Sequence, residues 1–185
     1  MITNYKNKLR KICAISTGVY LREPEGNEVC YLQISDVNNE DICAKSKHIA
    51  YRPELSGYIL KEGDLLMVSK GMAYACKLFE GKEPSIASTS FLVLHVTSPQ
   101  VMPEYLCWFL NHPNTIRIIR ARQEVSGTLM IRKIDIENIE VPIPEIMEQS
   151  RIVELAKLSR REGKLMAAIA ERKQTLMNQI IYNTL

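Results

Sequence analysis

The part of the chain best equipped to bind a charged partner is residues 117–133, where five cations accompany one acid, Glu124. Arginine and glutamine can form paired hydrogen bonds with guanine and adenine edges, and serine, threonine and lysine suit phosphates. This mixture favours nucleic-acid binding, although a solvated basic helix face explains the same composition. The predicted DNA contacts, which include one cation from an earlier glycine-containing corner, are Lys70, Arg120, Arg122, Gln123, Ser126, Thr128, Arg132 and Lys133.

Residues typical of catalysis or metal binding do not form a recognisable pattern. The sequence contains no glycine-rich nucleotide fingerprint, no P-loop and no Asn/Asp-Pro-Pro-aromatic tetrad of an adenine methyltransferase. His48, His95 and His112 lie far apart in sequence, and the five cysteines include no CxxC pair. Asp64 followed by Lys70 could suggest a nuclease, but a turn aspartate explains Asp64 adequately. The sequence therefore predicts no catalytic residue, no metal site and no cofactor in this chain.

Strand and turn signals alternate at short intervals through the first hundred residues. Residues 1–22 are expected to be an irregular lead-in with one short strand. The run Leu65–Val68 is apolar throughout and predicts a strand buried on both faces. Further strands are predicted over residues 29–34, 73–79 and 91–96.

Two prolines predict helix starts in the following segment. Pro103 suits the first position of a helix that ends near Asn111, and a second helix is expected after Pro113. The second helix should give way near Arg122 to a polar corner over residues 122–128. The predicted basic segment would therefore begin on a helix and continue in a loop.

The chain ends in a long uninterrupted run that follows the Val-Pro-Ile-Pro segment at 141–144. The two prolines predict an extended hinge, and beyond them Gly163 alone interrupts a predicted helix of about 55–60 Å. Such a helix is too long to be covered by a small head, so its apolar stripe should pair with a second copy; the alternative is a helix folded back over its own head. The stripe contains Ile152, Leu155, Met166, Ile169, Leu176 and Ile180, and is interrupted by Ser159, Glu162 and Lys173.

Composition agrees with this organisation. The chain has 185 residues, 46% of them hydrophobic, and a net charge of +3. It can form one ordinary core with an appendage, and no segment suits a secretory leader or a membrane span. We expect a cytoplasmic α+β protein with reduced cysteines, in which residues 1–143 form a β-rich globular domain and residues 144–185 one helix that pairs in a coiled coil.

Three C-terminal motifs carry a resemblance to a known family. They are Ser-Gly-Thr at 126–128, Ile-Glu-Val-Pro-Ile-Pro at 139–144 and Glu-Gln-Ser-Arg-Ile-Val at 148–153. In this order they resemble the specificity (S) subunit of type I restriction-modification systems. Residues 31–37 and 63–71 resemble the target-recognition domain of that subunit more loosely. Glu145 is a departure, because the family often has a second proline there, but an acid suits the first turn of a helix.

The resemblance implies a role and partners for each part of the chain. Residues 1–143 would be a target-recognition domain that binds double-stranded DNA, and residues 144–185 a helical spacer. The usual S subunit has two of each, so this chain looks like a half-length form whose antiparallel homodimer would read an interrupted palindrome, with the two halves at most about 17 base pairs apart. Modification (M) subunits would bring S-adenosylmethionine, and a restriction (R) subunit ATP and Mg. Two other interpretations stay open: a protein-interaction module that does not bind DNA, and a nuclease with an unfamiliar site.

Overall fold

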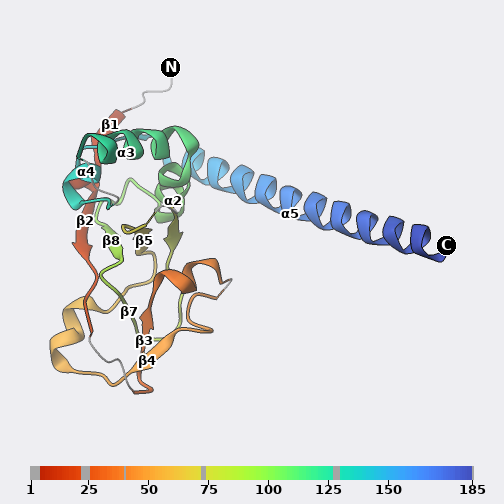
Figure 1. Ribbon diagram of the computed structural model, residues 1–185. Helices are drawn as coiled ribbons and strands as arrows, with labels where there is room; N and C mark the ends of the chain where they lie inside the picture. Colours follow the sequence, from red (N-terminus) through yellow and green to blue (C-terminus); the bar gives the residue numbers. More distant parts are fainter. Residues whose placement is uncertain (1–4, 22–25, 40, 72–73, 127–129, 185) are drawn as a thin grey trace.

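Four antiparallel strands in the order β2-β8-β5-β6 form the central sheet of the head in this computed structural model (Figure 1). The structure describes residues 5–21, 26–39, 41–71, 74–126 and 130–184, and at residues 38 and 124–126 it describes only the backbone. Leu65 and Met67 of β5 pack into one hydrophobic cluster, on the side of the helices. Leu66 and Val68 pack into a second cluster, on the opposite face. The predicted strand buried on both faces is thus confirmed. The four strands are β2 (Cys13–Thr17), β8 (Phe91–Val96), β5 (Leu65–Val68) and β6 (Cys76–Leu78).

A three-stranded sheet in the order β4-β3-β7 lies against the second cluster, at the end of the head away from the helices (Figure 1). Strand β3 is antiparallel to β4 and parallel to β7. Its side chains alternate, with Cys30 and Leu32 facing the central sheet and Val29 and Tyr31 in a third cluster beyond. The strands are β3 (Val29–Leu32), β4 (Lys47–Ile49) and β7 (Ser85–Ala87), and the short helices η1 (Ile34–Asn38) and η2 (Pro53–Tyr58) flank them.

Short helices cover the other face of the central sheet. Leu106 and Leu110 of α2 are fully buried there, and the Tyr105 hydroxyl donates a hydrogen bond of 2.7 Å to the Pro142 carbonyl oxygen. The helix predicted from Pro103 ends at Asn111 as expected. The helices are α1 (Leu9–Ile12), α2 (Pro103–Asn111), α3 (Pro113–Ser126) and α4 (Lys133–Glu137).

A small sheet that the sequence did not reveal joins the first residues of the head to its last ones. Strand β1 (Tyr5–Lys8) pairs antiparallel with β9 (Glu140–Ile143), with Lys6 opposite Pro142. The prolines do keep this segment extended, but it is a paired strand rather than a free hinge. Proline is tolerated because a two-stranded sheet has an unpaired side on each strand. The expectation of an irregular lead-in is wrong, since β1, α1 and β2 follow one another through residues 5–17.

Helix α5 (Ile146–Asn183) has 38 residues, so it is about 57 Å long, and it projects away from the head (Figure 1). Its first turns are anchored, because Gln149 and Val153 are buried. Every described residue from Lys157 onward is exposed. The alternative in which the helix folds back over its own head is therefore wrong. The α+β fold with a long C-terminal helix is confirmed; none of the described helices is apolar enough over a sufficient length to cross a membrane.

The five cysteines form no disulfide, and four of them are buried. Burial raises the pKa of the Cys13 thiol to about 12, so this group stays neutral and unreactive. The expected reduced thiols agree with this arrangement.

Candidate nucleic-acid interface

Helix α3 carries four of the eight predicted DNA contacts, and it is longer than the sequence suggested. It continues to Ser126, so Arg122 and Gln123 lie on a helix and not in a polar corner. Residues 122–125 contain no strong helix breaker, which explains the extension. Ile119 is fully buried beneath the helix, whereas Arg117 and Arg120 are exposed.

The structure brings Lys70 next to this segment although it lies some sixty residues earlier. The Ile131 amide donates a hydrogen bond of 2.8 Å to the Ser69 carbonyl oxygen, and Lys70 pairs with Met130 in an isolated β-bridge. Lys70 is exposed, and its Nζ donates a 3.2 Å hydrogen bond to Thr89 Oγ1. Lys70 therefore sits beside the segment that leads into Arg132.

Arg132 is held by a buried carboxylate at the start of α4. Its Nε and Nη2 donate to the two oxygens of Asp135 at 3.0 and 2.8 Å, and its backbone amide donates to Asp135 Oδ2 at 2.9 Å. The Asp135 side chain is 6% exposed and that of Arg132 47%. Hydrogen bonds from Arg132 lower the pKa of Asp135. The Nε and Nη2 donors of Arg132 are already bound to Asp135. The remaining N–H groups of the guanidinium therefore suit a phosphate better than a paired hydrogen bond to a base edge.

Arg122 also has a partner within the fold. Its Nη1 donates a 2.6 Å hydrogen bond to the Asp135 carbonyl oxygen, and its side chain is half-buried between α3 and α4. The guanidinium therefore joins the two helices. The sequence-based choice of Arg122 as a DNA contact did not foresee this hydrogen bond within the fold.

The remaining predicted contacts differ in what can be said of them. Lys133 forms an ion pair of 3.7 Å with Glu137, and Gln123 is half-buried. The backbone of Ser126 ends α3, and Thr128 lies outside the described residues. The side chain of Arg120 makes no hydrogen bond or ion pair within the described part of the chain. Arg120 and Lys70 are both exposed, and neither forms an ion pair within the described residues; all eight stay predictions as DNA-binding residues.

Replacing Asp135 with asparagine should lower the free energy of unfolding by about 1–3 kcal/mol, because a charge-assisted pair at a buried position is lost. The folded-state pKa of Asp135 is depressed, so its contribution is present above the unfolded pKa and is lost as the pH falls through the folded value. Urea unfolding at pH 7 and at pH 3 measures both effects, and the difference between the two proteins should shrink at low pH. The control is Glu137→Gln, which removes a longer ion pair and should change stability by less than about 0.5 kcal/mol. Equal stability of wild type and Asp135→Asn at pH 7 would show that the Asp135–Arg132 pair does not stabilise the fold.

Asp64 does not resemble a nuclease centre. Its side chain is 6% exposed, Oδ2 accepts the Lys61 amide at 2.8 Å, and Oδ1 lies 2.7 Å from His95 Nδ1. Among the described residues, no group of three potential metal ligands includes Asp64. The carboxylate closes a turn and orients a histidine, which supports the simpler explanation given from the sequence.

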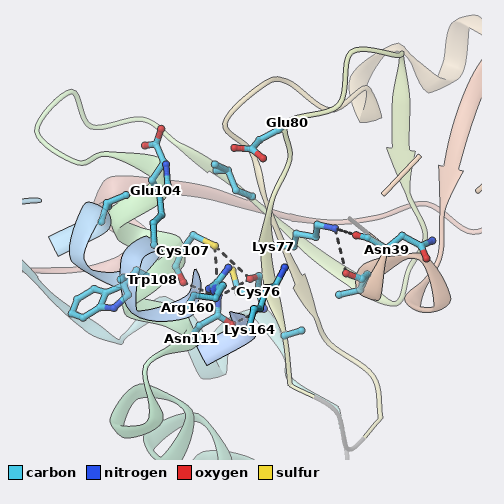
Figure 2. Close-up of a pocket in the computed structure, with 16 residues that line it drawn as sticks. Asn39, Cys76, Lys77, Glu80, Glu104, Cys107, Trp108, Asn111, Arg160 and Lys164 are labelled. Carbon is cyan, nitrogen blue, oxygen red and sulfur yellow. Dashed lines mark hydrogen bonds between the residues drawn. The ribbon is translucent and has the colours of Figure 1, made fainter. Parts of the chain in front are cut away.

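A groove of about 570 Å³ separates the head from the first exposed turns of α5 (Figure 2). Asn111 organises its floor, accepting the Cys76 amide at 3.0 Å and donating to the Cys76 carbonyl at 2.6 Å. Cations and acids both line it, so it lacks the one-sided charge of a DNA-binding surface. Its charged lining residues are Lys77, Glu80, Glu104, Lys157, Arg160 and Lys164.

The predicted pairing stripe of α5 is exposed over most of its length. Five of its six residues are between 49% and 66% exposed. Ile152 differs, because it packs partly against the core of its own head. Further large apolar side chains widen the stripe. The exposed members are Leu155, Met166, Ile169, Leu176 and Ile180, and the additional ones are Leu158, Leu165, Met177 and Ile181.

Comparison with known proteins gives one matching family model and several solved structures of similar fold. The family model described as "Type I restriction modification DNA specificity domain" matches residues 6–171. No curated protein matches the chain. The fold is similar to that of the HsdS subunit from Thermoanaerobacter tengcongensis, with a TM-score of 0.63 at 18% identity over 85% of this chain and 37% of that one.

Two further solved structures have the same fold. A chain from a study of complex assembly and conformational transition of the type I R-M system gives a TM-score of 0.66 at 19% identity, and covers 96% of this chain and 44% of that one. The type I S subunit from M. genitalium gives 0.55 at 14% identity, with the same coverage of 96% and 44%. The present chain therefore spans less than half the length of these solved chains.

Proposed function

The chain belongs to the type I restriction modification DNA specificity domain family, and from this premise we propose that it recognises a DNA sequence without catalysing a reaction on it. The observation that carries the proposal is the meeting of exposed cations from two distant parts of the chain. A backbone hydrogen bond and a β-bridge join the Ser69-Lys70 corner to the segment leading to Arg132, and Arg120 is a further exposed cation on α3. Such a group can neutralise phosphates while neighbouring polar side chains read base edges.

Helix α5 supports the second part of the proposal, which is pairing between two copies of this chain. Its exposed apolar stripe needs a partner of matching length, and a second α5 in the antiparallel direction provides one. Two heads would then lie at opposite ends of a helix pair about 57 Å long and read the two halves of an interrupted palindrome.

The third part concerns the partners that would carry out chemistry. Family membership favours docking of M subunits, which would supply S-adenosylmethionine, and of an R subunit, which would supply ATP and Mg. Within the described residues, neither a nucleotide-binding loop nor a group of metal ligands at Asp64 offers this chain such chemistry of its own.

Selection of bound duplexes from a random-sequence pool, with the full chain alone and with M subunits from a type I system, tests this function. We expect enrichment of two inverted half-sites separated by a spacer of fixed length. If no sequence is enriched and no duplex is retained, the result would favour a protein-interaction module that does not bind DNA. Cleavage of DNA by the chain and Mg²⁺ alone would favour the nuclease interpretation.

Removing Arg120 or Lys70 should weaken DNA binding roughly equally across sequences if each neutralises one phosphate. Each change to alanine should reduce the slope of log affinity against log salt by about 1. Fluorescence anisotropy with one duplex at four salt concentrations provides the slope. Arg172→Ala is the matched control, because it removes an exposed cation from the distant part of α5. Slopes that stay at the wild-type value in both Arg120→Ala and Lys70→Ala would remove these residues from the interface.

A further inference from the structure

Three potential metal ligands meet on the three-stranded sheet, far from the basic residues in sequence. Cys30 Sγ lies 3.3 Å from His48 Nε2 and 3.3 Å from Glu83 Oε2. The third side of this triangle, from His48 Nε2 to Glu83 Oε2, is 3.5 Å. Each residue thus offers one donor atom to the same point.

The strand register explains why residues 18 and 53 positions away from Cys30 reach it. Cys30 lies directly opposite His48 in the antiparallel pair of β3 and β4. On the other side, Cys30 is in register with Ser85 of β7, and its amide donates a 2.9 Å hydrogen bond to the Pro84 carbonyl oxygen. Glu83 therefore approaches Cys30 just before β7 begins.

The size of the triangle matches one face of a zinc coordination tetrahedron. Zinc binds sulfur at about 2.3 Å and nitrogen or oxygen at about 2.0–2.2 Å, so tetrahedral ligands lie about 3.3–3.6 Å from one another. We propose that Cys30, His48 and Glu83 form a binding site for Zn²⁺ or a similar divalent cation, with a solvent molecule as the fourth ligand. The Glu83 side chain is 64% exposed and that of His48 36%, so a cation can enter from solvent.

A nucleophilic cysteine is a poorer explanation of the same three residues. In a Cys-His-carboxylate site the carboxylate orients the imidazole through the ring nitrogen that does not face the thiol. Here Glu83 and Cys30 both approach Nε2 of His48.

Bound metal would tie together the three-stranded sheet, whose edge strand β4 is short. Strand β4 has three residues and pairs with β3 alone in its sheet. A cation held by β4, β3 and the segment before β7 would cross-link all three. The sequence predicted no metal because the ligand spacing is long, and strand pairing is what brings the ligands together.

The test uses the full chain, stripped of metal with a chelator and then titrated with Co²⁺ and with Zn²⁺ in competition with a chromophoric chelator. We expect one ion per chain and the thiolate-to-Co²⁺ charge-transfer absorption that a cysteine ligand produces. Cys30→Ser should abolish this absorption, and His48→Gln and Glu83→Gln should weaken binding at least tenfold. Cys13→Ser, which removes a buried thiol from another cluster, is the control and should bind as wild type does.

Two results would overturn the site. One is the absence of thiolate-to-Co²⁺ absorption in wild type, which would mean that the three residues form only a hydrogen-bonded cluster. The other is unchanged metal affinity in Glu83→Gln, a variant of an exposed residue that should fold normally. A thermal melt gives an independent measurement, because saturating Zn²⁺ should raise the Tm of wild type more than that of Glu83→Gln.

Discussion

Replacing Gln149 with leucine should lower the free energy of unfolding by about 3–5 kcal/mol. The Gln149 side chain is fully buried, and all of its observed partners are backbone groups. Oε1 accepts the Met102 amide at 2.9 Å, while Nε2 donates to the carbonyl oxygens of Gln100 and Pro144 at 2.7 and 2.8 Å. Leucine would leave these three groups without hydrogen-bond partners in the interior. Each such group costs about 1–3 kcal/mol.

Urea denaturation followed by circular dichroism measures this loss, which would be a large part of the stability of an ordinary domain. Gln174→Leu makes the same chemical change further along α5, where the side chain is exposed. It should change the free energy of unfolding by less than about 0.5 kcal/mol. If Gln149→Leu were as stable as Gln174→Leu, the buried amide would not fasten the helix to the head.

Gln149 also shows what a sequence motif can and cannot reveal. The Glu-Gln-Ser-Arg-Ile-Val motif at 148–153 indicated the start of the long helix, and α5 does begin there, at Ile146. The physical reason for the glutamine was not predictable, because its partners are backbone atoms at Gln100 and Met102. Backbone groups leave no signature in the sequence.

Elements defined by their own residues were predicted well. The apolar run of β5 needs burial on both faces, and Pro103 fits the first turn of α2 without losing a hydrogen bond. Elements defined by distant pairing were not. Strand β1 reads Tyr-Lys-Asn-Lys, with no apolar alternation, and it is a strand because β9 pairs with it from the other end of the head.

The role of the basic segment in DNA binding stays a prediction, but the structure shows internal contacts that its composition did not reveal. Two of its arginines, Arg122 and Arg132, bind the backbone carbonyl and the carboxylate of Asp135. Composition cannot distinguish an arginine that holds two helices together from one that faces solvent. Contact of Lys70 with this segment is equally invisible in sequence, since a bridge to Met130 creates it.

Two glutamates placed on the stripe of α5, Met166→Glu with Ile169→Glu, should raise the dissociation constant of the proposed dimer at least 100-fold. The pair would bury four uncompensated carboxylates in the antiparallel dimer, and one unpaired buried charge costs about 3–5 kcal/mol. Glutamate is a good helix former, so α5 should stay helical in this variant. The head and the anchored first turns of α5 should fold as they do in wild type. Sedimentation velocity over a range of concentrations measures the association.

The control carries the same two added charges on the outer side of the helix, as Ala168→Glu with Thr175→Glu, and should associate as wild type does. A wild-type chain that stays monomeric at high concentration would contradict pairing between copies, and equal association of the two glutamate variants would contradict pairing through this stripe.

The same variants separate pairing from DNA contact. A monomeric variant keeps Lys70 and Arg120, so it should still hold a single half-site, but it loses the gain in affinity that comes from linking two heads on one duplex. Binding to a duplex with two half-sites should therefore fall to the level of binding to one, which is the behaviour expected if the helix sets the distance between two identical readers.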